Sequence, residues 1–354
     1  MKSLILPVAG QSSRYPNMRP KWLLTMPDGK LMIEKSISKF NLTSFDMIYI
    51  VVLKSHIDQY VDRKNLLKIF KKNISKKLKI IELKKPTSCQ AETVYQAIIK
   101  GNIKGGIVIK DCDNMFSHNF SKKNLNEVLV LNLDKTDLIE AKSKSYITFD
   151  RLNKITNIVE KKVISDYFCC GAYSFKSAKI FLDYSSRLLK KSNNIFISHV
   201  IFDMLLNNHI FKYKEVRDYV DWGTIREFRN WQRKHITLFC DFDGCLVLNG
   251  SKFGKNGYKT RPIADNLVTI SQLLETGFVE LIITISRPDS EKKYIKNMLK
   301  KFQIYPRFII TGLMHGKRAL INDFSQTNPF PSALSINLER DSNKLSNILK
   351  NLII

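Results

Sequence analysis

Short apolar runs alternate with amphipathic helical patterns along nearly the whole chain, and this alternation limits the fold more than any other feature. The first third predicts strands and helices in turn: strands at 4–9, 47–53, 78–83 and 105–111, and helices at 30–40, 57–73 and 91–101. Strands separated by helices favour a mostly parallel sheet that is covered on both faces. The sequence therefore predicts an α/β fold.

The spacing of the strands changes after residue 127. Closely spaced strands predict an antiparallel extension at 127–133, 145–149, 155–160 and 168–175, followed by helices near 177–190 and 196–207. A second α/β series then begins at residue 236, with strands at 236–241, 279–286, 307–311 and 318–323 and helices near 263–276, 289–302 and 341–351. The break near 230–236 predicts two domains, 1–233 and 236–354.

The charge of the chain is strongly positive, at +26. Its lysines are scattered along helices without interleaved aromatic residues, so we expect solvated faces and no nucleic-acid partner. No apolar run approaches the roughly 18 residues of a membrane span, and no signal peptide is evident at the start. We therefore expect a cytoplasmic protein with no membrane partner, and a homo-oligomer stays open. The six cysteines and six histidines show no metal-binding spacing.

The first predicted strand ends in a loop that is suited to hold phosphate groups. Gly10 and small polar residues follow the strand, and Arg14 and Lys21 come next. Backbone N–H groups of such a loop can reach phosphate oxygens, and the two cations can neutralise a triphosphate and a departing pyrophosphate. An ordinary β–α turn is the alternative interpretation of this loop.

The stretch "LILPVAGQSSRYPNMRPKWLL" resembles the loop of the sugar-phosphate nucleotidyltransferases, and the resemblance extends over 1–232. Further matches are "PTSCQAETVYQAI", "VIKDCDNMF", "FDRLNKITNIVEKK", "CCGAYSF" and "YVDWGT". The resemblance implies a Rossmann-like mixed sheet and four groups of residues. These are the catalytic Arg14 and Lys21, the nucleotide-binding Ala9, Gly10, Ser12, Ser13 and Gln90, the sugar-binding Glu160, Lys161 and Gly171, and the metal-binding Asp113 and Asp221, with Asp111 in support.

The reaction implied is in-line displacement. The phosphate of a sugar or polyol phosphate attacks the α-phosphorus of a nucleoside triphosphate, and pyrophosphate leaves with the help of Mg²⁺. CTP is the first expectation for the nucleotide, with dTTP or UTP next. The chain departs from the family pattern at two places: Ser12 replaces the second loop glycine, and no proline follows Glu160 and Lys161.

Asp241 and Asp243 lie at the end of the strand that opens the second series. Residues two apart on a strand point to the same side, so both carboxylates can face one cavity at the carboxyl end of a sheet. Two adjacent carboxylates repel each other unless a cation or a shared proton relieves them. Mg²⁺ with a phosphate group suits such a pair.

The stretch "DFDGCLV" resembles the signature of the haloacid dehalogenase-like phosphatases, and the companion motifs follow in order. The resemblance implies an aspartyl phosphate on Asp241, acid–base catalysis by Asp243, and a Mg²⁺ site that Asp323 completes with both. The phosphate-binding hydroxyl falls on Thr284, with Ser286 as second choice, and the basic residue on Lys317, with Arg318 close behind. Only the short insert "NGSKFGKNGYKTRP" could act as a cap, so a smaller, nearly capless Rossmannoid domain is expected.

The leading hypothesis is a bifunctional enzyme that makes a nucleotide-activated sugar and hydrolyses a phosphate monoester. The resemblance points to bacterial surface polysaccharide such as a capsule. A second hypothesis keeps only the transferase active and assigns a docking or regulatory role to the second domain. A third is a basic nucleic-acid-binding protein, which a steep dependence of binding on salt would reveal.

Overall fold

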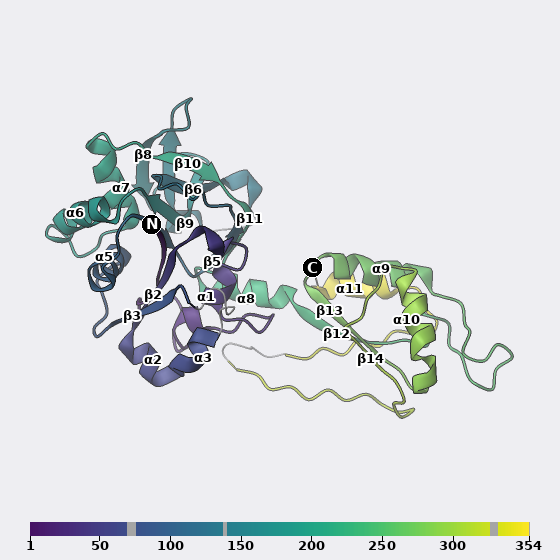
Figure 1. Cartoon of the computed structure of the whole chain (residues 1–354). Coiled ribbons are helices and arrows are strands. Elements are labelled where there is room, and N and C mark those ends of the chain that lie inside the picture. Colours follow the sequence, from purple (N-terminus) through teal and green to yellow (C-terminus); the bar gives the residue numbers. More distant parts are fainter. Residues whose placement is uncertain (69–75, 137–139, 326–331, 354) are drawn as a thin grey trace. The chain divides into compact units, whose positions relative to one another are not determined.

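The computed structural model describes residues 1–68, 76–136, 140–325 and 332–353 (Figure 1). Backbone contacts divide the chain into two compact units, Met1–Phe228 and Arg229–Ile354, which we call the N-terminal and the C-terminal unit. The division falls inside helix α8, Ile225–Lys234, a few residues before the boundary that the sequence predicts. No helix within the described ranges is long and apolar enough to cross a bilayer.

A mixed sheet forms the centre of the N-terminal unit. Over the described residues it has nine strands, and seven of them follow the order β10-β6-β9-β4-β1-β2-β3. The parallel half consists of β4 (Gly106–Lys110), β1 (Lys2–Pro7), β2 (Met47–Leu53) and β3 (Leu78–Leu83). The other half consists of β9 (Tyr167–Phe175), β6 (Glu127–Asn132), β10 (Lys212–Glu215), β7 (Ser145–Phe149) and β8 (Ile155–Glu160). Because β9 runs antiparallel to β4 and β6, the predicted antiparallel extension is confirmed.

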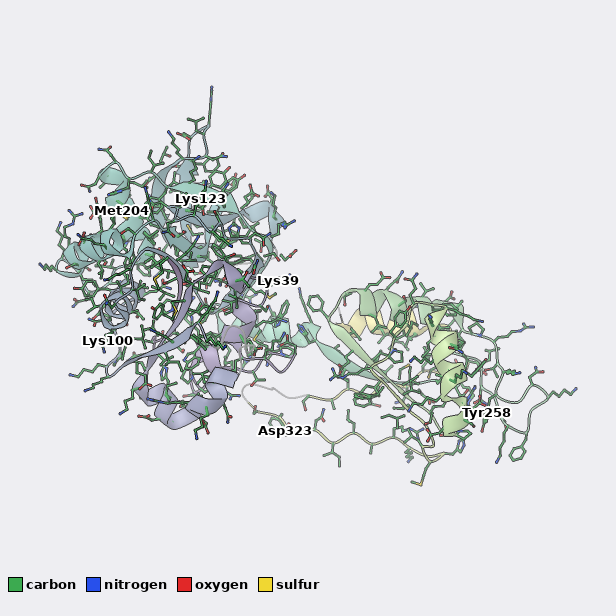
Figure 2. All side chains as sticks on the ribbon, in the orientation of Figure 1. Lys39, Lys100, Lys123, Met204, Tyr258 and Asp323 are labelled. Atoms are coloured by element: carbon green, nitrogen blue, oxygen red, sulfur yellow. The ribbon has the colours of Figure 1, made fainter. Side chains whose placement is uncertain are left out.

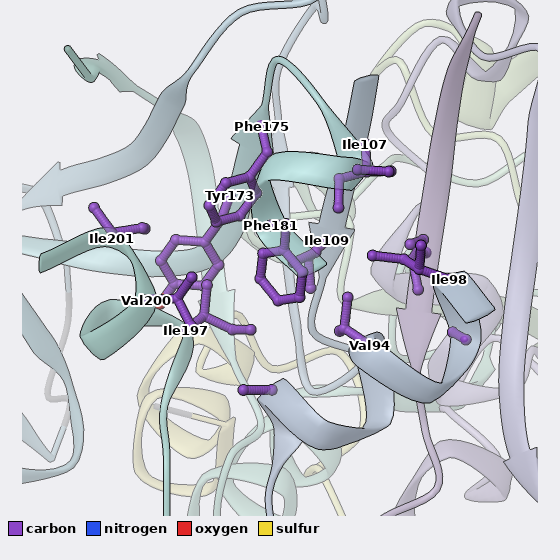
Figure 3. Packing of buried hydrophobic residues seen from close by; sticks show 14 of the residues in the cluster. Val94, Ile98, Ile107, Ile109, Tyr173, Phe175, Phe181, Ile197, Val200 and Ile201 are labelled. Atoms are coloured by element: carbon purple, nitrogen blue, oxygen red, sulfur yellow. The ribbon is translucent and has the colours of Figure 1, made fainter. Parts of the chain in front are cut away.

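Both faces of this sheet are buried. Along β1, Ile5 belongs to one hydrophobic core, whereas Leu4 and Leu6 belong to a second one. Helices α5 (Gln90–Gly101), α6 (Ala178–Leu189) and α7 (Ile197–Leu206) cover the first core, as Figure 3 shows. The shorter helices α1 (Met32–Ser36), α2 (Lys54–Tyr60) and α3 (Arg63–Lys68) contribute to the second. Successive side chains of β1 therefore point to opposite cores, in agreement with the predicted coverage of both faces.

Two predicted helices are shorter in the structure. The helix expected over 57–73 ends with α2, because Val61 is extended and a new helix begins after Asp62. The Asp62 carboxylate accepts a hydrogen bond from the Lys64 backbone N–H at 2.7 Å, as an N-cap residue does. The last positions of this prediction, 69–73, lie outside the described residues. The helix expected over 30–40 is reduced to α1, because the chain continues in tighter turns such as Phe40 N–H to Ile37 O.

The C-terminal unit has a sheet at its centre too, and its strands are all parallel within the described residues. Its described strands are β12 (Ile236–Asp241), β13 (Val279–Thr284) and β14 (Phe308–Ile310), with β13 in the middle. The helices are α9 (Ala264–Glu275), α10 (Lys292–Lys300) and α11 (Leu345–Ile353). Leu267, Ile283 and Leu299 are fully buried in its core. The predicted α/β series is therefore present up to residue 310.

The strand predicted over 318–323 is wrong. This segment has no strand partner within the described residues, and Leu320 and Ile321 are 53% and 94% exposed. Figure 2 shows Asp323 on an extended segment that leaves the sheet of its own unit. A short apolar run forms a strand only when a neighbouring strand supplies hydrogen bonds and burial, and the described chain supplies neither here.

A half-buried histidine, His118, should make the stability of the N-terminal unit depend on pH. His118 follows strand β5 (Asn114–Ser117) and packs edge-on against Phe120, with ring centroids 4.7 Å apart. Burial and then the charges of Lys2 and Lys214 lower the pKa of His118 from 6.5 to about 4. A lowered folded-state pKa means that its contribution to stability is present above pH 6.5 and is lost as the pH falls through 4.

We therefore expect the wild-type protein to lose more stability between pH 6.5 and pH 4 than His118→Asn does. The difference should be about 1–2 kcal/mol after a discount for solvent screening. Urea unfolding at several pH values, followed by circular dichroism, measures it. Parallel pH profiles for the two proteins would contradict this prediction.

Candidate active site

A cleft of about 780 Å³ opens at the carboxyl ends of β1 and β4 in the N-terminal unit. Most residues that the sequence singled out in this unit line it: Gly10, Ser12, Ser13, Arg14, Lys21, Gln90, Asp113, Glu160, Lys161 and Gly171. Ala9 does not, because it is fully buried beneath the loop. The Asp221 carboxylate lies just behind the surface, with its side chain 5% exposed. Ligands bind at this edge of open α/β sheets, so the cleft is the candidate site.

Ser12 gives the first loop its shape. Its φ of 54° lies in the left-handed region that glycine adopts most easily. Its carbonyl accepts a hydrogen bond from the Tyr15 N–H at 2.8 Å, and its hydroxyl accepts one from the Lys21 N–H at 3.0 Å. The serine therefore takes a backbone conformation that favours glycine and ties the loop to the turn Lys21–Leu23.

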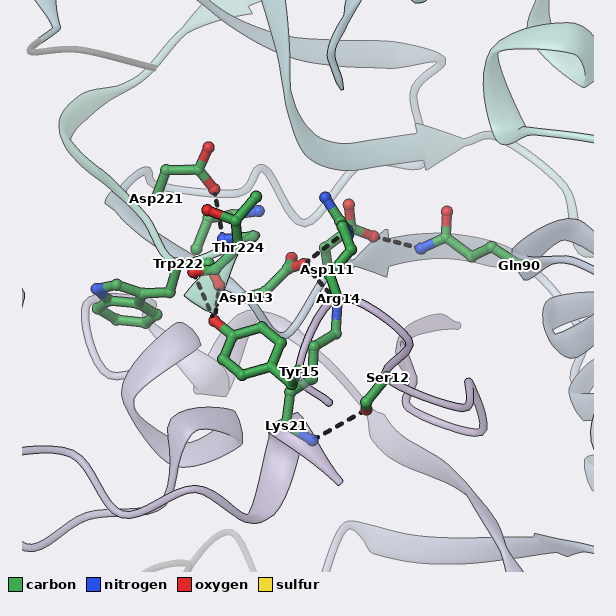
Figure 4. A network of polar contacts seen from close by, with 12 residues as sticks. Ser12, Arg14, Tyr15, Lys21, Gln90, Asp111, Asp113, Asp221, Trp222 and Thr224 are labelled. Atoms are coloured by element: carbon green, nitrogen blue, oxygen red, sulfur yellow. Dashed lines mark hydrogen bonds and ion pairs between the residues drawn. The ribbon is translucent and has the colours of Figure 1, made fainter. Parts of the chain in front are cut away.

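Asp113 lies between two cations of this loop. Its Oδ2 is 2.5 Å from Lys21 Nζ and 3.5 Å from the Arg14 guanidinium (Figure 4). Burial alone would raise the pKa of Asp113, but the charges of Lys21 and then Arg14 outweigh burial and hold the pKa well below its usual range. Asp113 is therefore an anionic carboxylate at the centre of the cleft.

Asp221 is brought next to Asp113 by a short antiparallel pair of strands, β11 (Arg217–Asp221) and β5. Asp221 pairs with Asn114, and the Trp222 N–H donates to the Asp113 carbonyl at 2.7 Å. The Asp221 carboxylate forms an ion pair with Lys144 Nζ. Sequence reasoning missed Lys144, because nothing distinguishes it from the other basic residues before the chain is folded.

The two aspartates suit a divalent cation that is shared with a phosphorylated substrate. Mg²⁺ commonly binds through one or two carboxylates together with phosphate oxygens. Within the described ranges, no three His, Cys, Asp or Glu side chains gather to hold a metal by themselves. Asp113 and Asp221 would therefore hold Mg²⁺ only as part of such a shared set.

Asp111 is held from several directions beside this pair. The Gln90 amide, at the start of α5, donates to its carboxylate, and the fully buried Lys110 donates to its carbonyl at 2.6 Å. Burial and the charge of Asp113 raise the pKa of Asp111 to about 6. Gln90 was predicted to read the nucleotide base, and the structure places it in the cleft with one amide hydrogen already used by Asp111.

Gly171 has no room for a side chain. Its φ is +70°, and a Cβ would lie 2.5 Å from Asp111 Oδ2 and 2.7 Å from Asn114 Nδ2. We expect Gly171→Ala to lower the free energy of unfolding by about 2–3 kcal/mol, from backbone strain and overpacking together. Gly10→Ala is the matched control, because no atom lies within 4 Å of its added Cβ. Thermal unfolding of both variants tests this, and equal melting temperatures would contradict it.

Glu160 and Lys161 also line the cleft. Glu160 Oε2 accepts hydrogen bonds from the Ser145 hydroxyl and from the Ser198 hydroxyl, the latter at 2.6 Å. Both serines are buried, and the structure rather than the sequence identified them. Lys161 Nζ lies 4.4 Å from the centroid of the Phe196 ring. A carboxylate fixed through one oxygen can offer the other to a hydroxyl group of a ligand.

In the C-terminal unit, Asp241 ends β12 and pairs with Thr284 at the end of β13. Ser286 and Arg318, the two second choices, contact each other, since the guanidinium lies 3.4 Å from the hydroxyl. Burial raises the pKa of Asp241, and the Arg318 charge opposes this rise. Lys317 is exposed, and no polar contact is seen for it among the residues that the structure describes.

Asp243 is held by a residue that sequence reasoning missed. Arg287 is 1% exposed and donates to both carboxylate oxygens of Asp243, at 3.0 Å and 2.5 Å. Arg287 also donates to the Tyr258 carbonyl at 2.7 Å. A bidentate guanidinium fixes the position of the Asp243 carboxylate. The described residues do not bring Asp241, Asp243 and Asp323 together as a metal-binding trio.

Comparisons with known proteins address the fold of the N-terminal unit. No protein-family model matches the sequence, and a search of curated proteins finds no significant match. The nucleoside-diphosphate-sugar pyrophosphorylase from Vibrio cholerae RC9 is similar in structure, with a TM-score of 0.55, 18% identity, and 65% of this chain and 99% of that chain covered. UDP-glucose pyrophosphorylase with bound UDP-glucose gives a TM-score of 0.51 at 17% identity, covering 66% of this chain and 97% of that one.

The inositol-1-phosphate CTP transferase from T. maritima is similar as well, with a TM-score of 0.50, 15% identity, and 64% and 90% of the two chains covered. At these identities the likeness concerns the fold. The covered share is close to the part of the chain that Met1–Phe228 occupies. The mixed α/β sheet therefore has the fold of the sugar-phosphate nucleotidyltransferases over about 65% of the chain.

Proposed function

We propose that the N-terminal unit transfers a nucleotidyl group from a nucleoside triphosphate to a sugar or polyol phosphate and releases pyrophosphate. The observation that carries the proposal is the arrangement of one cleft. Arg14, Lys21 and Asp113 line it together with Glu160 and Lys161, and the Asp221 carboxylate lies just behind its surface. The likeness in fold to a CTP transferase and to two pyrophosphorylases supports it.

In this proposal the triphosphate lies along the loop from Gly10 to Arg14. Arg14 and Lys21 neutralise the charge that builds up on the leaving pyrophosphate, and both already contact an anionic group, Asp113. Bound Mg²⁺ would draw electrons from the α-phosphate and orient it. The remaining task is positioning, because the reaction needs no covalent intermediate on the protein.

The acceptor is proposed to bind in the cleft beside Glu160 and Lys161. Ser145 and Ser198 fix one oxygen of Glu160, so its other oxygen is available to a sugar or polyol hydroxyl. Lys161 would pair with the phosphate of the acceptor, which brings the attacking oxygen toward the nucleotide. Lys161 itself has a left-handed φ of 55°.

A screen of nucleotides against phosphorylated acceptors tests the proposed function. Purified protein with Mg²⁺ is incubated with CTP, UTP, dTTP, ATP or GTP and a panel of sugar and polyol phosphates, and pyrophosphate is measured. We expect at least one pair to react, with CTP first and dTTP or UTP next. Arg14→Ala sets the background, and a panel in which no pair exceeds that background would overturn the proposal.

A second candidate function concerns the C-terminal unit, for which we propose phosphate monoester hydrolysis through an aspartyl phosphate on Asp241. Asp241, Ser286 and Arg318 supply a nucleophile, a hydroxyl and a cation near the carboxyl edge of the sheet. The Arg287 pair with Asp243 favours the alternative of a docking or regulatory unit, and so does the segment 318–323, which joins no strand within the described residues. A nucleotide-activated sugar from the N-terminal unit would suit the synthesis of a surface polysaccharide such as a capsule.

A further inference from the structure

Lys144 is a buried cation for which the proposed reaction has no stated role. It follows the turn Ala141–Ser143 and precedes β7, and its side chain is 13% exposed. Its ammonium forms an ion pair with Asp221 Oδ2, and the side chain of Asp221 is 5% exposed. A buried carboxylate needs a compensating charge, so Lys144 supplies in this structure the charge that a divalent cation would supply in the proposed reaction.

Lys144 has a second partner that does not depend on Asp221. Its Nζ lies 3.2 Å from the Tyr219 hydroxyl and 5.8 Å from the centroid of the Tyr219 ring. An ammonium that left Asp221 would therefore keep a hydrogen bond and a cation–π contact. Asp113 is balanced differently, because both Lys21 and Arg14 contact its Oδ2.

We propose that Lys144 is an exchangeable counter-ion of the metal site: it neutralises Asp221 in the metal-free protein, and a divalent cation displaces it toward Tyr219. The proposal rests on the proposed nucleotidyl transfer for the presence of a metal at Asp113 and Asp221. It assigns to Lys144 a positioning role that acts on metal affinity. Displacement of the lysine weakens metal binding in the wild type, and the same pair stabilises the metal-free fold.

Metal binding to the full chain tests this without any turnover. Free Mn²⁺ is measured by electron paramagnetic resonance during titration of wild type, Lys144→Met and the matched control Lys142→Met, which lines the same cleft. We expect Lys144→Met to bind Mn²⁺ about 5–50-fold more tightly, as for an ordinary coupling between two sites. Lys142→Met should bind Mn²⁺ as tightly as the wild type. Asp221→Asn tests whether the measured binding takes place at Asp221.

Melting temperatures give the second readout. Lys144→Met should melt below the wild type without metal, and Mn²⁺ should raise its melting temperature more than that of the wild type. Equal or weaker Mn²⁺ affinity in a folded Lys144→Met, with metal-dependent pyrophosphate release intact in the wild type, would overturn this proposal alone. Absence of Mn²⁺ binding in every variant, together with metal-independent release, would overturn it along with the proposed metal site.

Discussion

Asp113→Asn should lower pyrophosphate release by about a thousandfold, because the loss of a metal-binding charge removes roughly 4 kcal/mol of transition-state stabilisation. The amide also leaves Lys21 and Arg14 without the anion that they share. The measurement is initial pyrophosphate release at saturating Mg²⁺ with the best substrate pair from the screen. Asp221→Asn should show a loss of the same order, since its carboxylate is proposed to bind the same ion.

The control for this experiment is Asp218→Asn. Asp218 belongs to the same strand, β11, and also pairs with a lysine, Lys39, at 3.1 Å, but this pair is exposed. Its loss should change turnover less than about twofold, because exposed ion pairs contribute little. If Asp113→Asn keeps near wild-type turnover with an unchanged circular dichroism spectrum, the assignment of this carboxylate to the metal site is wrong.

Asp241→Asn should remove phosphate monoester hydrolysis, with a loss of at least about a thousandfold, since a neutral amide is a poor nucleophile. Hydrolysis of p-nitrophenyl phosphate measures this activity, and pyrophosphate release by the same variant should stay within about twofold of wild type. Arg14→Ala should show the opposite pattern. The reason is that each candidate site is built from side chains of its own unit.

Glu280→Gln is the matched acid-to-amide control in the C-terminal unit. Glu280 is on β13, and its carboxylate pairs with Arg307 at 2.5 Å, away from the carboxyl end of the strand. It should leave hydrolysis unchanged. A wild-type protein that hydrolyses no phosphate monoester would instead support the docking or regulatory alternative, and one substitution that silenced both activities in a folded protein would contradict separable sites.

Local sequence was sufficient to identify most strands. The predicted ranges 47–53, 78–83, 145–149 and 155–160 agree with β2, β3, β7 and β8. Short runs rich in apolar residues predict these elements, and each of them has a partner strand in the sheet. The small-residue loop before Arg14 and Lys21 was equally visible, because its chemistry is carried by consecutive residues.

Where an element needed a distant partner, the sequence was a poorer guide. The run 318–323 has apolar residues at its centre, Ala319–Ile321, yet no strand within the described residues receives it. The helix expected over 57–73 broke at Asp62, because a local cap competes with continuation of the helix. The secondary-structure propensity of a segment is only a preference. The stabilising energy comes from neighbouring strands or capping side chains, and the hydrophobic pattern of the segment does not show them.

The candidate site divides in the same way. Arg14, Lys21, Asp113 and Glu160 could be identified by residue type and order, and they do share one cleft. Lys144 on Asp221, Arg287 on Asp243 and Ser198 on Glu160 are pairings between residues far apart in the chain. Before folding, each is one charged or hydroxyl side chain among many. Only the packed sheet and its helices decide which cation and which hydroxyl are buried against a given carboxylate, because burial is what makes such a pairing necessary.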